Sequence, residues 1–345
     1  MKKIILLIYV SLFSLTFIVA QGWERDLSEG IQVSDQSNDG GVIVATTLMV
    51  NDSLTSRITK VDSLGNIVWE KDETYSTTQD GGWQQQLLQS ESDTSFLLVT
   101  TFDSDLPFFQ SFKKYTQDGN LIWENYYNDQ RIRDIADAGN GDYFVLGYLG
   151  GDYLQKINAA GNLIWEQTYA NNELVSIGKI SLAANNEIIV FGLKKIGRLD
   201  ALGNVLWVDD SISGANLYFN DVTELASGDL LITAQRWNSN GSGYSSELLT
   251  VSSAGTLINT LSIPQFNIPD TYTQGYPQVN ELTDGSILIA GVVRNNLTFD
   301  KDLALLKIDA SGNEIWFRKY GQSGTEFFQN FMVESDDTYY LTGNV

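Results

Sequence analysis

The stretch Val61-Asp62-Ser63-Leu64-Gly65-Asn66-Ile67-Val68-Trp69 is one copy of a unit that recurs along this chain. In each copy a short apolar run ends at a turn that contains glycine. In five of the six copies a tryptophan follows four residues after that glycine. The further copies are Gly119 with Trp123, Gly161 with Trp165, Gly203 with Trp207 and Gly312 with Trp316, and Gly255 with Asn259 is the degenerate one.

The spacing of these units indicates the fold. Successive glycines lie 42 to 57 residues apart, a period that is typical of a four-stranded propeller blade and not of a helical hairpin. Between the units, apolar or alternating runs break at turn residues such as Asp39-Gly40, which predicts strands throughout. We therefore predict an all-β chain, a β-propeller of four-stranded antiparallel blades. We name the strands of a blade A to D in chain order.

The number of blades follows from counting the strand patterns. Seven A–B turns and seven B strands are visible, but only six C strands. Trp23 reads as a lone D strand that completes the last blade and so joins the two ends of the propeller. In that last blade strand A would span 328–335 and strand B 338–344, and strand C is missing because the sequence stops at Val345. We predict seven blades, with eight as the alternative, and a chain truncated at its C-terminus.

The repeat tryptophans are expected to be structural. Each would fill the space between adjacent blades, since a tryptophan buries a large apolar area. This group comprises Trp23, Trp69, Trp123, Trp165, Trp207 and Trp316.

The first twenty residues read as an export signal. Lys2 and Lys3 precede an apolar stretch that ends at the small residue Ala20. The alternative, an uncleaved membrane anchor, is disfavoured because the stretch is shorter than the roughly 20 apolar residues that span a bilayer. We therefore predict a signal peptide at 1–20, a propeller domain at 21–345, and a protein that is secreted or displayed at the cell surface.

Composition excludes several classes of function. The formal net charge is −22, which argues against nucleic acid or an anionic membrane as partner, because phosphate binding needs a basic patch. The chain has no cysteine and no histidine. Disulfides, thiol nucleophiles and histidine-based acid–base pairs are therefore excluded. We expect a monomer without a cofactor or metal and without membrane contact after removal of the signal.

The repeat, written K/R-x-D-x-x-G-N-x-x-W, resembles the repeats of PQQ-like (quinoprotein-type) β-propellers, and more closely those of secreted bacterial repeat propellers. The resemblance covers residues 23–345. It implies the propeller fold, although the turn from Asp62 to Gly65 is one residue tighter than is usual in that family. No adjacent cysteine pair or set of quinone-binding residues can be placed on this sequence, so the resemblance does not carry a cofactor over. The aspartate box of sialidases, Ser-x-Asp-x-Gly-x-x-Trp, has a different spacing from Asp62, Gly65 and Trp69 of this repeat.

Candidate ligand-binding residues lie on one face of the predicted propeller. In an up-and-down meander the B–C and D–A connections share a face, and in this chain they hold every long insertion, among them the B–C loops predicted at 47–56 and 235–246 and the D–A loop predicted at 74–84. Scaffolds usually display function on such loops, and aromatic rings are suitable for stacking on sugar rings or peptide side chains. The alternative is that these rings only cap the ends of the blades. The candidates are Trp83, Trp237, Tyr244, Tyr272 and Tyr276.

Two functions follow from this sequence. The first is a secreted, non-enzymatic binding or scaffold module whose long-loop face engages a protein or a glycan. The second is a glycan-active hydrolase or lyase that works with carboxylates alone. Its loose candidates on the same face are Asp103, Asp105, Asp270 and Asp300.

Overall fold

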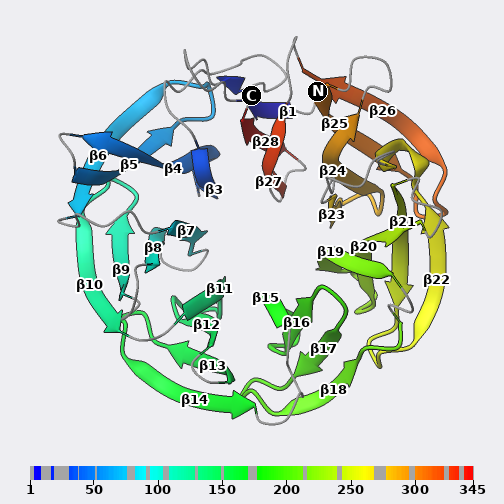
Figure 1. Ribbon diagram of the computed structural model, residues 1–345, viewed down its shortest axis with the longest axis horizontal. Coiled ribbons are helices and arrows are strands. Elements are labelled where there is room, and N and C mark those ends of the chain that lie inside the picture. Colours follow the sequence, from blue (N-terminus) through cyan, green and yellow to red (C-terminus); the bar gives the residue numbers. More distant parts are fainter. Residues whose placement is uncertain are drawn as a thin grey trace. The chain divides into compact units, whose positions relative to one another are not determined.

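The computed structural model describes residues 4–8, 17–18, 31–37, 39–50, 53–75, 82–90, 94–103, 109–128, 131–148, 151–169, 177–212, 216–238, 243–267, 277–294, 300–321, 326–333 and 338–344. Apart from one short 3₁₀ helix, η1 (Pro264–Phe266), every regular element within these ranges is a strand (Figure 1). Among the described residues, no helix is long and apolar enough to cross a membrane. The all-β prediction is therefore confirmed.

Within the described residues, six sheets are blades of four consecutive strands in chain order. The first three of these blades have the following strands. Blade 1 contains β3 (Ile31–Ser37), β4 (Gly41–Val50), β5 (Ser53–Val61) and β6 (Ile67–Tyr75); blade 2 contains β7 (Gly82–Gln89), β8 (Ser95–Asp103), β9 (Phe109–Thr116) and β10 (Leu121–Asn128); blade 3 contains β11 (Arg131–Asp137), β12 (Tyr143–Tyr148), β13 (Asp152–Ile157) and β14 (Leu163–Tyr169).

The other three blades repeat this order. Blade 4 contains β15 (Ile177–Leu182), β16 (Ile188–Gly192), β17 (Ile196–Leu199) and β18 (Val205–Asp209); blade 5 contains β19 (Leu217–Glu224), β20 (Leu230–Trp237), β21 (Tyr244–Val251) and β22 (Leu257–Ser262); blade 6 contains β23 (Gln278–Glu281), β24 (Ile287–Arg294), β25 (Lys301–Ile308) and β26 (Glu314–Tyr320).

A seventh sheet is built differently. Its strands β27 (Phe327–Val333) and β28 (Tyr339–Asn344) form the antiparallel pair expected of strands A and B. The third strand of this sheet is β1 (Ile4–Ile8), which runs parallel to β28, and β2 (Phe17–Ile18) follows it (Figure 1). A parallel neighbour cannot belong to an up-and-down meander.

The predicted count of seven or eight blades is therefore wrong for the described residues. The fold is a β-propeller with six antiparallel four-stranded blades, and the seventh sheet is not such a blade because residues from the start of the chain supply two of its strands. The predicted D strand at Trp23 lies outside the described residues.

By their internal contacts the residues divide into two compact units. One unit comprises Glu29–Val190 and Arg198–Leu206, with blades 1 to 3 and part of blade 4. The other comprises Met1–Ser28, Phe191–Gly197 and Trp207–Val345, with the rest of blade 4, blades 5 and 6 and the seventh sheet. Each unit has its own apolar core. In the first unit, for example, Leu97, Val99 and Phe112 of blade 2 pack with Tyr143 and Val145 of blade 3.

The aspartate and glycine of the repeat build the turn between strands C and D. Asp62 Oδ1 accepts hydrogen bonds from the backbone N–H groups of Leu64 at 2.8 Å and Asn66 at 2.9 Å. The Asn66 side chain in turn donates to Asp62 Oδ2 at 3.0 Å. Gly65 has φ +87°, a conformation that glycine adopts without steric cost. The aspartate, glycine and asparagine of the motif are thus explained by one turn.

The basic residue of the motif pairs with an acid at the A–B turn of its own blade. In blade 1, Lys60 Nζ lies 2.6 Å from Asp39 Oδ2. The Lys60 side chain is almost wholly buried, whereas that of Asp39 is exposed, so the carboxylate compensates the buried ammonium from the rim. The same ion pair joins Lys156 to Asp142, Arg198 to Glu187 and Lys307 to Asp284.

The repeat tryptophan links one blade to the next. Trp69 of β6 donates its indole N–H to the carbonyl oxygen of Gln117, 2.9 Å away in the C–D turn of blade 2. Its ring also covers Gly119 of that turn, where a Cβ atom would lie only 3.3 Å from the ring. Corresponding contacts to the next glycine are made by Trp123 on Gly161, Trp165 on Gly203 and Trp207 on Gly255.

The degenerate copy keeps this contact with another side chain. Asn259 occupies the tryptophan position of blade 5. Leu261, two residues further along β22, covers Gly312 of blade 6 instead, and a Cβ on that glycine would lie 2.7 Å from Leu261 Cδ2. Trp316 of blade 6 packs against the apolar cluster that contains Phe331 and Tyr339 of the seventh sheet.

Candidate functional site

Two of the five predicted ligand-binding residues form an aromatic pair. Trp237 ends β20 and Tyr244 begins β21, and the two residues are direct cross-strand partners. Their ring centroids lie 5.0 Å apart with the planes at 67°, an edge-to-face arrangement. Both side chains are partly exposed. Both residues therefore belong to strands, whereas the sequence predicted a loop at 235–246.

The hairpin that carries this pair is held by polar contacts. The backbone N–H of Asn238 donates to the carbonyl oxygen of Gly243 at 2.9 Å, which extends the strand pairing beyond Trp237. Side chains alternate between the two faces of a strand, so Arg236 lies on the face opposite Trp237. There its guanidinium donates two hydrogen bonds to the Glu247 carboxylate, at 2.7 and 3.0 Å. These hydrogen bonds raise the pKa of Arg236. The aromatic pair thus has a fixed support.

Of the other three predicted ligand-binding residues, the structure describes one. Trp83 lies in β7 of blade 2, where its cross-strand partner is Phe102 of β8. It therefore also occupies a strand and not the predicted loop 74–84. Tyr272 and Tyr276 lie outside the described residues.

Two of the four acidic candidates lie within the described residues. Asp103 is the last residue of β8, and Asp105 and Asp270 lie outside the described residues. Asp300 immediately precedes β25 and is partly exposed. Burial raises the pKa of the nearby Asp302, with the negative charge of Asp300 acting in the same direction and Lys319 opposing it. The structure describes no group of three or more acidic residues that could hold a metal ion.

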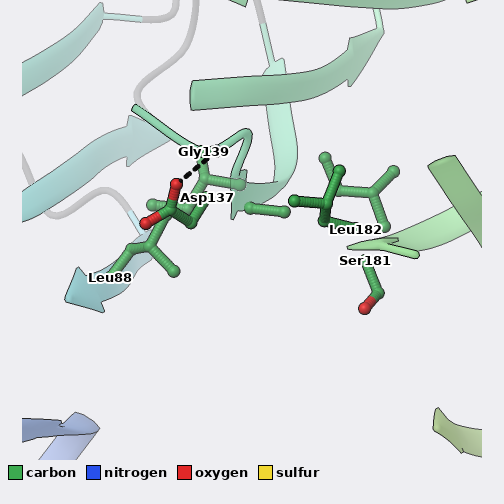
Figure 2. A pocket seen from close by; sticks show the side chains of 8 residues that line it. Leu88, Asp137, Gly139, Ser181 and Leu182 are labelled. Atoms are coloured by element: carbon green, nitrogen blue, oxygen red, sulfur yellow. Dashed lines mark hydrogen bonds between the residues drawn. The ribbon is translucent and has the colours of Figure 1, made fainter. Parts of the chain in front are cut away.

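A hollow that the sequence did not predict lies in the unit with blades 1 to 3. It has a volume of about 660 Å³ and is lined by the ends of β7, β11 and β15, the A strands of blades 2, 3 and 4. Figure 2 shows Leu88 and Asp137 on one side and Ser181 and Leu182 on the other. We call this hollow the recess. Its lining residues come from three separate A strands, so no local sequence motif marks them.

The A strands around the recess are joined by hydrogen bonds between blades. Gln86 of β7 donates from its side-chain amide to the carbonyl oxygen of Arg133 in β11 at 2.6 Å. Asp134 of β11 accepts from the backbone N–H of Ile180 in β15 at 2.8 Å. Asp134 is buried, and burial raises the pKa of its carboxyl although Lys179 lies 3.5 Å away and opposes this effect.

In the other unit, strand A side chains at the corresponding position also bind the backbone of the next A strand. Asp221 of β19 accepts from the backbone N–H of Val279 in β23 at 2.9 Å. Gln278 of β23 accepts from the backbone N–H of Phe331 in β27 at 2.8 Å. An amide or carboxylate at one position of strand A therefore binds the backbone of the next A strand in both units, and at Gln86 and Asp134 this contact joins the strands that line the recess.

Exposed apolar side chains recur on the D strands. The two residues before each repeat tryptophan are aliphatic in most blades, as with Leu121 and Ile122 before Trp123, which are 47% and 50% exposed. Leu163 and Ile164 of blade 3 are 56% and 49% exposed. These groups recur because they occupy the same two positions of the repeat in each blade.

The sequence matches no protein-family model and no curated protein. Solved structures do resemble the fold. The WD40 domain of Neurospora crassa Pan2 has a TM-score of 0.53 and 11% identity, with 91% of this chain and 89% of that chain covered. The propeller of Dos1 has a TM-score of 0.54 and 11% identity, with 91% of this chain and 77% of that chain covered.

A third similar structure is an enzyme. The S511A mutant of puromycin hydrolase, solved with PGG, has a TM-score of 0.57 and 11% identity, and the match covers 99% of this chain and 58% of that chain. At such low identity these likenesses show the fold alone. The chain is a β-propeller.

Proposed function

We propose that this chain is an exported, non-enzymatic binding module that engages a glycan or a protein segment through Trp237 and Tyr244. The observation that carries the proposal is their edge-to-face pair, partly exposed at the end of a braced hairpin. The repeat tryptophans contact the next blade, whereas Trp237 lies outside the repeat. Rigid aromatic side chains supply contact area at low entropic cost, which suits them for stacking on sugars or peptide groups.

Neighbouring polar groups fit the same kind of ligand. Asn238 follows Trp237 and receives a hydrogen bond from the Ser245 hydroxyl at 3.3 Å. A sugar hydroxyl or a peptide amide stacked on the rings would meet these two polar side chains beside it. The proposal also includes export by a signal peptide at 1–20 and membership of the repeat among PQQ-like propeller repeats.

A glycan array and a peptide array with the mature protein, residues 21–345, test this function. We expect one class of ligand to bind, and Trp237→Ala to reduce the affinity at least ~10-fold, the size of about 1.4 kcal/mol of contact energy. The matched control is Tyr148→Ala, because Tyr148 is an exposed aromatic ring at the corresponding end of β12. Equal binding by the wild type and Trp237→Ala would rule the aromatic pair out as the site.

One observation favours the second candidate, a carboxylate-dependent hydrolase or lyase. The pKa of Asp302 is raised by burial and by the negative charge of Asp300, and enzymes of this class need one carboxyl group that stays protonated. A hydrolysis screen over the glycans of the array distinguishes the two functions. Turnover that disappears in Asp302→Asn would support the enzyme, and its complete absence supports the binding module.

A further inference from the structure

The recess has the shape and lining of a site for a small ligand that is independent of Trp237 and Tyr244. Its volume of about 660 Å³ lies within the range of small-molecule sites. It is formed at the A–B turn ends of β7, β11 and β15, and hydrogen bonds between the A strands hold its walls. It is therefore built on strands and not on long loops.

Aliphatic side chains supply part of the wall of the recess. Ile135 and Ile180 are 7% and 6% exposed, and Ala136 is also buried. Leu88 and Leu182 extend this surface on opposite sides (Figure 2). A ligand of matching size would bury an aliphatic stem here, at roughly 0.8 kcal/mol for each methylene group removed from water.

Two polar side chains stand at the edges of this apolar surface. The Asp137 carboxylate receives a hydrogen bond from the backbone N–H of Gly139 at 2.7 Å, which fixes its orientation (Figure 2). An ionised carboxylate has about four acceptor positions and can accept further donors. Ser181, on the other side, carries a hydroxyl group.

The charges around the recess favour a cationic ligand. Asp137 is the one charged residue among the described residues that line it. Lys179, which precedes the lining residue Ile180 in β15, lies 3.5 Å from Asp134. The whole chain carries a formal charge of −22, which concentrates cations near its surface.

We propose that the recess binds an aliphatic ammonium group, with the cationic head at Asp137 and the carbon stem along Ile135 and Ile180 toward Ser181. An ammonium presents three donors and no acceptor, which matches the carboxylate of Asp137, an acceptor without donors. The natural ligand would be a free alkylamine or a lysine side chain of a peptide. Both present the same chemistry.

Titration calorimetry with n-hexylamine, n-hexanol and hexanoate at neutral pH tests the inference on the mature protein. The three probes share one carbon stem and differ only in the head group. We expect the amine to bind most tightly, the alcohol about 10-fold more weakly, and the carboxylate not at all, because a charge-assisted hydrogen bond is roughly twice as strong as a neutral one. A lysine peptide with apolar flanks then separates the two ligand sources.

Two variants locate the head group. Asp137→Asn keeps an oxygen that can accept from Gly139 and should reduce binding of the amine to that of the alcohol. Ser181→Lys places a cation at the rim and should abolish amine binding while the alcohol still binds. Asp229→Asn, at the A–B turn of blade 5, is the control and should change nothing. Equal affinity for amine and alcohol, no binding of either, or an unchanged preference in Asp137→Asn would overturn the proposal.

Discussion

Trp207 of blade 4 lies against Gly255 of blade 5. A Cβ atom on Gly255 would be 2.8 Å from the indole ring, and the indole N–H donates to the carbonyl oxygen of Ser253 in the same turn at 3.0 Å. The repeat therefore contains both halves of a contact between blades, because each copy supplies a tryptophan to the next blade and a glycine to the previous one. This explains why the two residues recur together.

Replacement of Gly255 by alanine should destabilise the protein more than the same change at Gly228. The two glycines have φ of +86° and +85°, so alanine carries the same backbone cost at both, about 1–2 kcal/mol. A Cβ at Gly228 meets nothing within 4 Å, whereas one at Gly255 displaces Trp207. We expect a further loss of about 1–3 kcal/mol in the free energy of unfolding at Gly255, measured by denaturant titration.

The control is a double-mutant cycle with Trp207→Ala. Once the ring is removed, Gly255→Ala should cost no more than Gly228→Ala, since the extra term comes from this pair alone. Equal losses for the two glycine variants in the wild-type background would show that the tryptophan exerts no steric demand on the turn.

The turn aspartates should make the protein sensitive to acid. The side-chain amide of Asn204 and the backbone N–H groups of Asn204, Leu202 and Gly203 hold the pKa of Asp200 below its ordinary value. Because the folded-state pKa is lower than the unfolded one of about 3.8, this stabilisation is complete above about pH 4 and is lost as the pH falls through the folded-state pKa.

Asp200→Asn tests this sign. Asn158 already caps the corresponding turn of blade 3, accepting from the backbone N–H groups of Ala160 and Asn162, so asparagine should serve at neutral pH. The variant should lose less stability than the wild type between pH 4 and pH 2, as followed by circular dichroism. Asp200→Ala should instead be weaker at every pH, by about 1 kcal/mol at neutral pH. Parallel acid profiles of wild type and Asp200→Asn would contradict this account.

Asp134 should change the pH dependence of stability in the opposite direction to Asp200. Burial raises the pKa of this carboxyl in the folded protein, so the folded state retains a proton that the unfolded state has already lost. The stability of the wild type should therefore decrease as the pH rises from about 4 through the folded-state pKa. Asp134→Asn does not titrate and should lack this decrease. Unfolding curves recorded in a pH series give the comparison, and identical slopes for the two proteins would refute it.

The exposed aliphatic residues of the D strands should contribute to association and not to folding. The double variant Ile122→Thr and Ile164→Thr retains β-branched side chains that favour strands. It should change the free energy of unfolding by less than about 0.5 kcal/mol at each site and reduce light scattering at high concentration. Val145→Thr, at a position that is 1% exposed, is the buried control and should destabilise the protein clearly.

The sequence predicted the elements that repeat and missed those that do not. The glycine and asparagine signals located the hairpin turns, and the final A and B strands agree with β27 and β28 within a few residues. The blade count was wrong because strand pairing between distant segments, such as β1 with β28, leaves no local signal. The loops predicted at 47–56 and 235–246 are shorter in the structure. Strand β4 extends to Val50 and β5 begins at Ser53, while β20 extends to Trp237 and β21 begins at Tyr244.

One of the two candidate sites could be identified from the sequence and the other could not. Trp237 was identifiable because it breaks the repeat, and its pairing with Tyr244 follows once the hairpin register is known. The recess was not predictable. Asp137 reads as an ordinary turn residue, and Ile135 and Ile180 read as core residues, because only the packing of three A strands brings them together.

The central claim is that the repeat tryptophans maintain the fold while Trp237 is available to a ligand. Thermal unfolding of Trp207→Ala and Trp237→Ala, recorded side by side, tests it most directly. We predict a loss of about 2 kcal/mol and a clearly lower Tm for Trp207→Ala, since large-to-small changes at packed aromatic sites are costly. For Trp237→Ala we predict a loss of about 1 kcal/mol or less, the size of one aromatic pair. An equal or larger loss for Trp237→Ala would contradict the account.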